Sequence, residues 1–104
     1  MKLEVGQFVR TNEGKITKLI EIDKDEFKRF DKLVDFTNYK INKASHNVID
    51  LIEVGDYVNG ELVLEKVLYG NNAGVKVFGD TYFDDEIQSI VTKEQFSAME
   101  YKID

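Results

Sequence analysis

The side chains that could do chemistry in this 104-residue chain are few. His46 is the only histidine and there is no cysteine, which excludes a multi-histidine site, a thiolate metal site and a thiol nucleophile. Ser45 directly precedes His46, but adjacent residues rarely face each other as nucleophile and base, so we expect a surface or capping role for His46. We therefore expect no catalytic residue, no enzyme activity and no cofactor.

Carboxylates form the one dense group of polar side chains. Asp80, Asp84, Asp85 and Glu86 lie within seven residues. Calcium prefers carboxylate oxygens, but the Asp-x-Asp-x-Asp-Gly series of an EF-hand loop is absent, and no glycine-rich phosphate loop occurs. The cluster favours a solvated acidic turn or a partner-binding patch, and we expect no metal site.

The formal net charge of -6 is unevenly distributed. Residues 1–52 hold ten Lys/Arg and nine Asp/Glu (+1), whereas residues 53–104 hold four Lys/Arg and eleven Asp/Glu (-7). An acidic surface repels phosphate backbones, so we expect no direct nucleic-acid binding. It attracts a basic partner, although acidity that serves solubility alone is the simpler interpretation.

Tyrosines accompany the carboxylates of the second half. Tyrosine supplies rigid contact area and cation–π contacts, so the pattern suits a surface that docks on Lys and Arg. The alternative is core packing with the hydroxyl at the edge. On the first interpretation, the partner-binding residues are Asp56, Tyr57, Glu61, Glu65, Tyr69, Asp80, Tyr82, Asp84, Asp85 and Glu86.

The elements that position these residues are expected to be strands, because Val and Ile, which favour strands, together number twenty. A first hairpin is predicted from Glu4–Thr11 and Lys15–Ile22 around a turn at Gly14. Residues 23–35 are ambiguous between a helix and a charged excursion, and we expect the excursion, followed by a strand near Leu33–Ile41. Phe27 and Phe30 in this region are more typical of core residues than of base-stacking platforms.

A second hairpin turns at Asn59-Gly60, the strongest short signal for a type I′ turn. Its return strand is predicted at Glu61–Tyr69, after which 70–74 reads as a loop. Thr92 and Gln95 match a capping box and predict a short helix at Lys93–Met99. Further short strands are expected at Val75–Phe78, Thr81–Phe83 and Ile87–Val91, with a short strand or a single helical turn at Val48–Ile52 and a strand or tail at Tyr101–Ile103.

One pattern occurs twice, as Glu4-Val5-Gly6-Gln7-Phe8-Val9 and as Glu53-Val54-Gly55-Asp56-Tyr57-Val58. It indicates either two related half-barrels or convergence on a common way of opening a strand. We expect a mainly β fold with one or two short helices, built as a small bent antiparallel sheet or an SH3-like barrel. The chain then forms a single domain, with 1–45 and 46–104 as candidate half-units.

No apolar run approaches the length that spans a bilayer, and no signal-peptide pattern opens the chain. These features predict a cytoplasmic protein without membrane contact. The oligomeric state is open.

Two stretches, Ile49–Gly60 and Ile90–Phe96 with Met99-Glu100-Tyr101, resemble a group of short, mostly uncharacterised proteins. The group is carried by phages, prophages and mobile elements of low-GC Gram-positive bacteria, and Val5–Thr11 is similar to its start. The resemblance does not extend to 23–45 or 70–86 and carries no catalytic residue. It implies a setting in which small acidic proteins often inhibit host defence, as anti-CRISPR proteins do.

The resulting hypothesis is an anti-defence protein that inhibits a nucleic-acid-binding effector of the bacterial host by stoichiometric binding through an acidic surface. The partner would be a basic host protein such as a CRISPR effector. Two alternatives remain: an SH3-like accessory or adaptor domain that binds a protein through an apolar groove, and a small-ligand-binding anti-defence protein.

Overall fold

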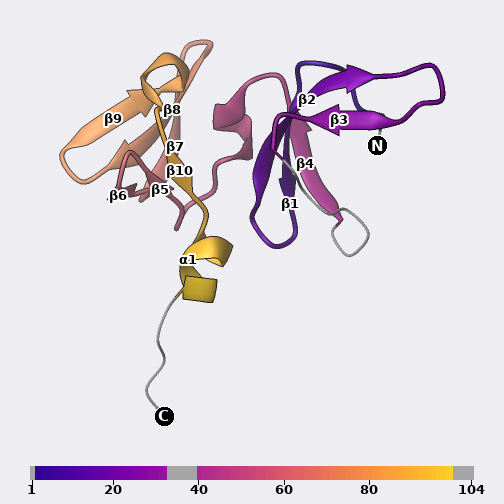
Figure 1. The fold of residues 1–104 in the computed structure, drawn as a ribbon. Coiled ribbons are helices and arrows are strands. Elements are labelled where there is room, and N and C mark those ends of the chain that lie inside the picture. The colour runs from indigo at the N-terminus through magenta and orange to yellow at the C-terminus, as the bar shows by residue number, and fades with distance from the viewer. Residues whose placement is uncertain (1, 33–39, 100–104) are drawn as a thin grey trace. The chain divides into compact units, whose positions relative to one another are not determined.

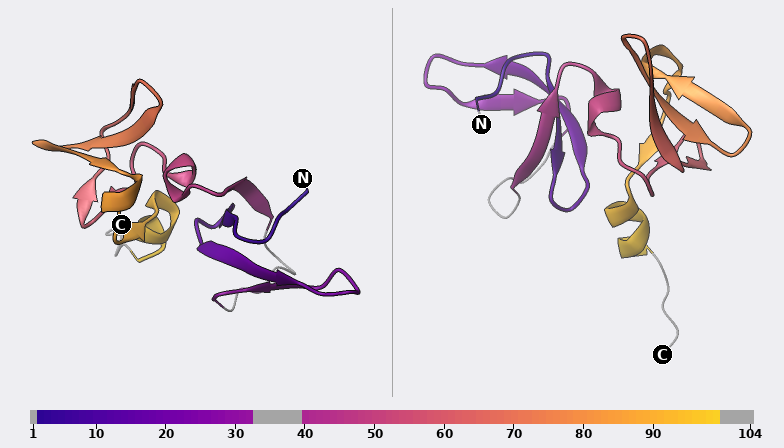
Figure 2. Two further views of the ribbon diagram at one scale, coloured as in Figure 1. Left: turned by 90° about the horizontal axis from the view of Figure 1, so that it is seen from above. Right: turned by 180° about the vertical axis from the view of Figure 1, so that it is seen from behind.

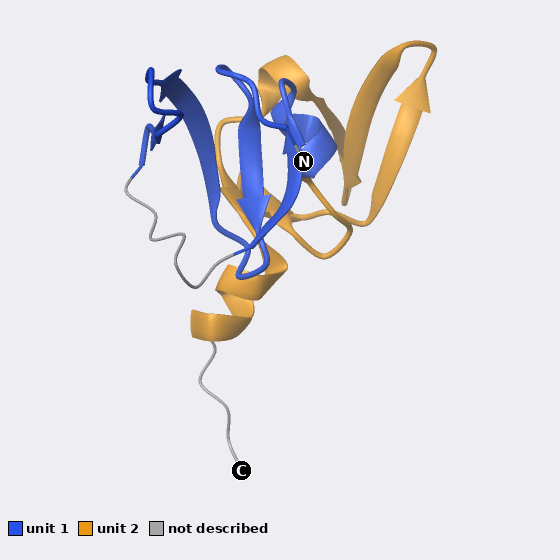
Figure 3. Ribbon diagram, turned by 90° about the vertical axis from the view of Figure 1, so that its right-hand side faces the viewer, with its two compact units in different colours: residues 1–51 blue, residues 52–104 orange. Residues whose placement is uncertain are grey.

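Short antiparallel strands make up most of the regular structure, as the abundance of Val and Ile predicts. The computed structural model describes residues 2–32 and 40–99. The mainly β prediction is confirmed, with one α-helix and two 3-10 helices in the described part of the chain. The chain divides into two compact units, unit 1 (residues 1–51) and unit 2 (residues 52–104) (Figure 3).

Unit 1 contains one four-stranded antiparallel sheet in the order β3-β2-β1-β4 (Figure 1). Its strands are β1 Phe8–Thr11, β2 Ile16–Ile22, β3 Lys28–Phe30 and β4 Ile41–Ser45. The buried core joins Leu3, Val9 and Leu19, with Phe30 packed against it. The sheet thus confirms the predicted first hairpin, while most of the strand expected at 33–41 lies outside the described residues.

The side of β2 that faces the core is not the isoleucine side. Ile16, Ile20 and Ile22 share a face at period two, but Ile20 and Ile22 are exposed. Leu19 and Thr17 on the other face are buried. Successive side chains of a strand point to opposite faces of the sheet. Three isoleucines at every second position therefore indicate a strand, but they do not determine which of its faces packs on the core.

Unit 1 ends with the 3-10 helix η1 (Val48–Leu51). The Ser45 hydroxyl donates to Asp50 Oδ2 at 2.6 Å, and buried Arg10 donates from its guanidinium to the Leu51 carbonyl at 2.9 Å. These contacts tie η1 to unit 1, which ends at Leu51.

Unit 2 opens with the predicted hairpin. β5 (Tyr57–Val58) and β6 (Glu61–Leu62) flank Asn59 and Gly60, both of which have the positive φ of a type I′ turn (52° and 82°). β10 (Ile90–Val91) pairs with β5 on the other side, giving the sheet order β10-β5-β6.

The remaining strands form a three-stranded meander of β7 (Glu65–Tyr69), β8 (Asn72–Val77) and β9 (Asp80–Phe83), seen from two further directions in Figure 2. The predicted strand Glu61–Tyr69 is therefore divided between two sheets. The predicted 70–74 loop is a two-residue turn, because Tyr69 and Asn72 are already register partners. The three sheets of the described residues remain separate, and none closes into a barrel.

Helix α1 (Lys93–Met99) confirms the predicted capping box. The Gln95 amide donates to Thr92 Oγ1 at 3.3 Å, and the Thr92 amide donates to Gln95 Oε1 at 3.2 Å. The 3-10 helix η2 (Asp84–Glu86) follows β9, and the strand predicted at Ile87–Val91 is present in shorter form as β10. Tyr101–Ile103 lies outside the described residues.

Candidate partner-binding surface

Asp56 is buried and holds the backbone of unit 2 together. One carboxylate oxygen accepts the Glu53 amide at 2.7 Å, and the other accepts the Lys93 amide at 2.9 Å. The side chain is fully inaccessible to solvent. Asp56 therefore joins the start of β5 to the start of α1, and the structure does not place it on a partner-binding surface as the sequence suggested.

Tyr57 lies beside Asp56 in the chain but faces the other way. Its ring stacks on Phe96 of α1, with centroids 4.8 Å apart and planes 26° apart. Its register partners are Leu62 on β6 and Val91 on β10. Tyr57 thus belongs to a half-exposed apolar row rather than to a group of carboxylates.

Glu61 and Tyr82 come together from different sheets, because the Tyr82 hydroxyl donates to the Glu61 carboxylate. This hydrogen bond is the main cause that raises the pKa of Tyr82 above its ordinary value, with the negative charges of Glu61, Asp80 and Glu86 adding to it. Both side chains are half-buried. The pair is a local contact between β6 and β9.

The register of the meander separates two other pairs of the predicted set. Glu65 and Tyr69 lie on one face of β7, together with Phe83, whose ring centroid is 6.0 Å from that of Tyr69. Asp80 and Tyr82 lie on the opposite face of β9. Glu65 and Asp80 therefore cannot contribute to one flat surface of this sheet.

Gly74 explains how the Tyr69 face is packed. A Cβ at this mid-strand position would lie 3.1–3.2 Å from side-chain atoms of Val67, Thr81 and Phe83. The absence of a side chain lets these residues close over the strand. Val67, Thr81 and Phe83 consequently approach the strand closely at the middle of this face.

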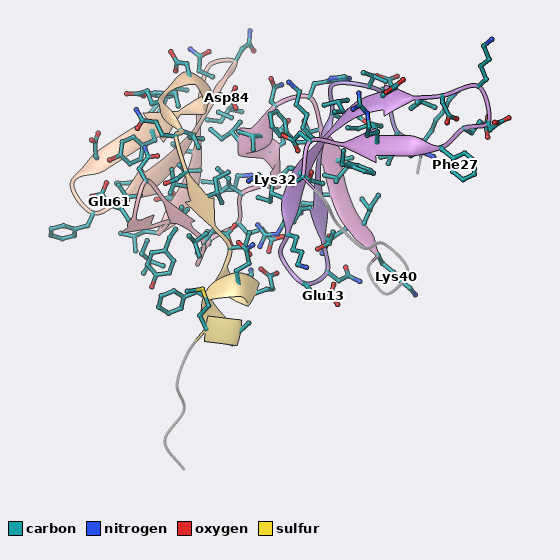
Figure 4. All side chains as sticks on the ribbon, in the orientation of Figure 1. Glu13, Phe27, Lys32, Lys40, Glu61 and Asp84 are labelled. Carbon is teal, nitrogen blue, oxygen red and sulfur yellow. The ribbon has the colours of Figure 1, made fainter. Side chains whose placement is uncertain are left out.

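The densest carboxylates, Asp84, Asp85 and Glu86, are exposed on η2. Asn59 positions the segment that follows, since its amide nitrogen donates to the Glu86 carbonyl and its Oδ1 accepts the Gln88 and Ser89 amides. The sequence indicated Asn59 only as a turn residue. Figure 4 shows Asp84 well apart from Glu61 within unit 2, so the predicted residues do not all gather at one point, although Glu61, Asp80 and Glu86 all act on Tyr82.

The other candidate residues have local partners. His46 Nε2 lies 3.0 Å from Glu4 Oε2, in an exposed contact. In the basic and acidic run after β2, the Asp23 carboxylate accepts the Asp25 and Phe27 amides and closes the β2–β3 hairpin. Phe27 at that tip is 72% exposed (Figure 4), which contradicts its interpretation as a core residue; Phe30 does pack on the core.

Within residues 2–32 and 40–99, no group of three His, Cys, Asp or Glu side chains is arranged to hold a metal ion. None of the helices in these ranges is long and apolar enough to cross a membrane.

Comparisons with known proteins leave the resemblance to phage and mobile-element proteins as a prediction. No family model, no curated protein and no solved structure matches the chain.

Proposed function

We propose that the chain is a non-enzymatic inhibitor that binds a basic, nucleic-acid-binding protein through unit 2. The observation that carries this proposal is that the charge divides where the fold divides. Unit 1 holds ten Lys/Arg and nine Asp/Glu, whereas unit 2 holds four Lys/Arg and eleven Asp/Glu. A net negative charge that served only solubility would not need to be confined to one structural unit.

The distribution within unit 2 supports a steering role for this charge. Exposed carboxylates lie on both faces of the meander and on η2, while Lys93 is paired with Glu53 at 2.7 Å and Lys76 is the register partner of Glu65. Summed charge of one sign raises the rate of encounter with a surface of the opposite sign, even without a single contiguous patch.

The resemblance to phage and mobile-element proteins supplies the setting of the proposal. There, the partner is a defence effector of the bacterial host, such as a CRISPR nuclease, whose nucleic-acid channel is basic. Binding by unit 2 would occupy that channel stoichiometrically, in the bacterial cytoplasm, and would require neither a cofactor nor catalysis.

The test uses a fluorescent oligoarginine peptide as a stand-in for a basic channel, with binding followed by anisotropy. Binding should weaken strongly between about 0.1 M and about 1 M salt, over which the Debye length falls from about 10 Å to about 3 Å. Asp84→Lys with Asp85→Lys should weaken binding about tenfold at low salt. Glu13→Lys with Asp25→Lys, the same charge change in unit 1, should have a much smaller effect.

Binding that ignores salt, or that responds equally to the two double variants, contradicts the proposal. A far-UV circular dichroism spectrum for each variant shows that it is folded. The same variants then enter a competition in which the chain displaces a DNA duplex from a basic CRISPR nuclease.

A peptide-binding adaptor is the second candidate function, and the exposure of large apolar side chains in unit 2 favours it. Leu68 is 70% exposed and Phe78 is 90% exposed. An adaptor that relied on such side chains alone would bind an uncharged apolar peptide, with little dependence on salt.

A further inference from the structure

We infer that an apolar strip on unit 2 docks an arginine-bearing, apolar segment of the basic partner, an inference that rests on the proposed function. The strip joins β10, β5, β6 and α1, and we call it the α1 strip. It consists of Tyr57, Leu62, Val91, Phe96 and Met99.

The register of the small sheet places part of the strip on one face. Tyr57 is the direct partner of both Leu62 and Val91, so these three side chains form a row across β6, β5 and β10. The neighbouring row centres on Val58, which is fully buried. The core of unit 2 therefore lies on the Val58 side, and the α1 strip lies on the opposite side, with Leu62 and Val91 about two-fifths exposed.

Helix α1 extends this row without burying it. None of its seven residues is buried, although an amphipathic helix of a globular protein normally packs its apolar face against the core. Phe96 is 49% exposed despite its stacking on Tyr57, and Met99 is 82% exposed. The apolar face of α1 is thus available to a partner.

Polar contacts hold the first turn of α1 in this position. An isolated helix of seven residues is not stable in water. Here the Thr92–Gln95 capping box, the Asp56 carboxylate on the Lys93 amide and the Lys93–Glu53 ion pair fix its first turn. The anchoring leaves Phe96 and Met99 at the open end of the helix.

Charge identifies the occupant as basic. At the base of α1, Glu53 pairs with the Lys93 ammonium at 2.7 Å and Asp56 accepts the Lys93 amide at 2.9 Å, so carboxylates outnumber cations there. Together with the excess of acids in unit 2, this disfavours a second copy of unit 2 as the occupant.

Arginine fits the surroundings of the α1 strip better than lysine does. Its planar guanidinium stacks on aromatic faces, and the Tyr57–Phe96 pair offers such an aromatic surface. Aliphatic side chains of the same segment would pack on Leu62, Val91 and Met99.

The experiment compares two fluorescent peptides of equal length and charge, one alternating Arg and Leu and the other alternating Arg and Ser. We expect the full chain to bind the Arg–Leu peptide about tenfold more tightly in an anisotropy titration at low salt. Phe96→Ser with Met99→Ser should abolish this preference and leave the Arg–Ser affinity within about twofold. Phe27→Ser, which removes a still more exposed aromatic side chain from unit 1, should retain the preference.

The possible results separate the two proposals. If neither peptide binds, the proposed function falls and the inference falls with it. If both bind equally, the proposed function stands and the inference is overturned. If the chain dimerises through the strip and the dimer shows no preference for the Arg–Leu peptide, the inference is overturned. It is likewise overturned if the preference appears only after residues 100–104 are removed, because the chain itself then covers the strip.

A chemical-shift map of the Arg–Leu complex provides a second readout that does not depend on the variants. Shifts concentrated on β5, β10 and α1 support the docking site. Shifts concentrated on η2 and β9 would place the apolar contacts elsewhere and overturn it.

Discussion

Residues 4–9 in unit 1 and residues 53–58 in unit 2 share one sequence pattern and one local structure. In both, the fourth residue closes a β-turn on the first: the Gln7 amide donates to the Glu4 carbonyl and the Asp56 amide to the Glu53 carbonyl, each at 3.1 Å. Gly6 and Gly55 occupy the third turn position with φ of 93° and 98°, as a type II turn requires.

The pairing that follows each turn also matches. Leu19 in unit 1 and Val63 in unit 2 each use their carbonyl to accept the glycine amide and their amide to donate to the carbonyl of the fourth turn residue. The sixth residue of each pattern, Val9 or Val58, is fully buried, and the second, Val5 or Val54, is about half exposed. The repeated sequence therefore has the same structural meaning in both units.

The difference lies in the fourth side chain. In unit 1, Gln7 Oε1 accepts the Glu4 amide at 2.8 Å. In unit 2, Asp56 makes the equivalent contact and its second oxygen accepts the Lys93 amide. A shorter, charged side chain at this position thus links the turn to a distant helix. One polar residue can therefore give two otherwise equivalent turns different long-range roles.

The largest expected effect follows from this link. Asp56→Ala leaves two amides without their acceptor in a buried site, and we expect it to lower the free energy of unfolding by about 3 kcal/mol. Gln7→Ala should cost about 1 kcal/mol, because it removes one contact from a partly exposed turn. Native-state hydrogen exchange of the Val63 and Leu19 amides reports the loss separately for each unit.

Asp56→Asn refines this test, because it keeps one oxygen acceptor and should fall between the two alanine variants. Equal losses for Asp56→Ala and Gln7→Ala would show that the contact with α1 contributes no stability.

The next effect tests whether the turns are equivalent. Gly6→Ala and Gly55→Ala should each cost about 1–2 kcal/mol, because a side chain is strained at these positive φ values. The nearest atoms to an added Cβ are His46 Nδ1 at 3.5 Å and Lys93 Cδ at 3.4 Å, which are ordinary contacts. The two losses should therefore agree within about 0.5 kcal/mol in urea unfolding experiments.

Gly60→Asn serves as a control for the glycine pair. Gly60 also has positive φ, but no atom lies within 4 Å of an added Cβ, and asparagine tolerates this conformation. Its loss should be clearly smaller. A cost for Gly55→Ala far above that for Gly6→Ala would end the equivalence of the two turns.

A smaller effect distinguishes how the aromatic residue of each pattern is covered. Phe8 lies under the Lys18 ammonium, 5.3 Å from the ring centroid, whereas Tyr57 is covered by Phe96. Lys18→Ala should cost about 0.5 kcal/mol and Phe96→Ala about 1.5 kcal/mol, as shifts of the urea midpoint. Met99→Ala, which alters the exposed end of α1, should leave the midpoint unchanged. A shift as large as that of Phe96→Ala would show that Met99 is packed rather than open to solvent.

Local patterns predicted the parts of the fold that local physics determines. The type I′ turn at Asn59-Gly60 and the capping box at Thr92 depend on neighbours within three residues, and both are present. The division of Glu61–Tyr69 between two sheets depends on where distant strands pair, and no local pattern carries that information.

The candidate surface shows the same limit. The sequence grouped Asp56 with Asp84 by residue type, but burial and register separated them. The acceptor role of Asp56 depends on the amide of Lys93, which is 37 residues away. The exposure of α1 was equally hidden, since Phe96 and Met99 at helical spacing predict a buried face as readily as an open one.

The smallest expected effect is a difference in how the two units respond to pH. The Lys18 backbone amide, donating to Asp31 at 2.8 Å, is the main cause that lowers the pKa of Asp31 in unit 1, and the Thr17 hydroxyl adds to it. A lowered carboxyl pKa contributes stability above its ordinary value, near pH 4, and this stability is lost as the pH falls through the folded-state pKa.

Unit 2 should respond at the opposite end of the pH scale. The hydrogen bond to Glu53 is the main cause that raises the pKa of Lys93, so its contribution is present below the ordinary lysine value, about pH 10.4, and is lost as the pH rises through the raised pKa. Asp31→Asn should therefore flatten only the acid limb of a plot of urea midpoint against pH, and Lys93→Met only the alkaline limb. If either substitution changes both limbs, the two units do not titrate independently. Their stabilities are then coupled in a way that their separate hydrogen-bond networks do not explain.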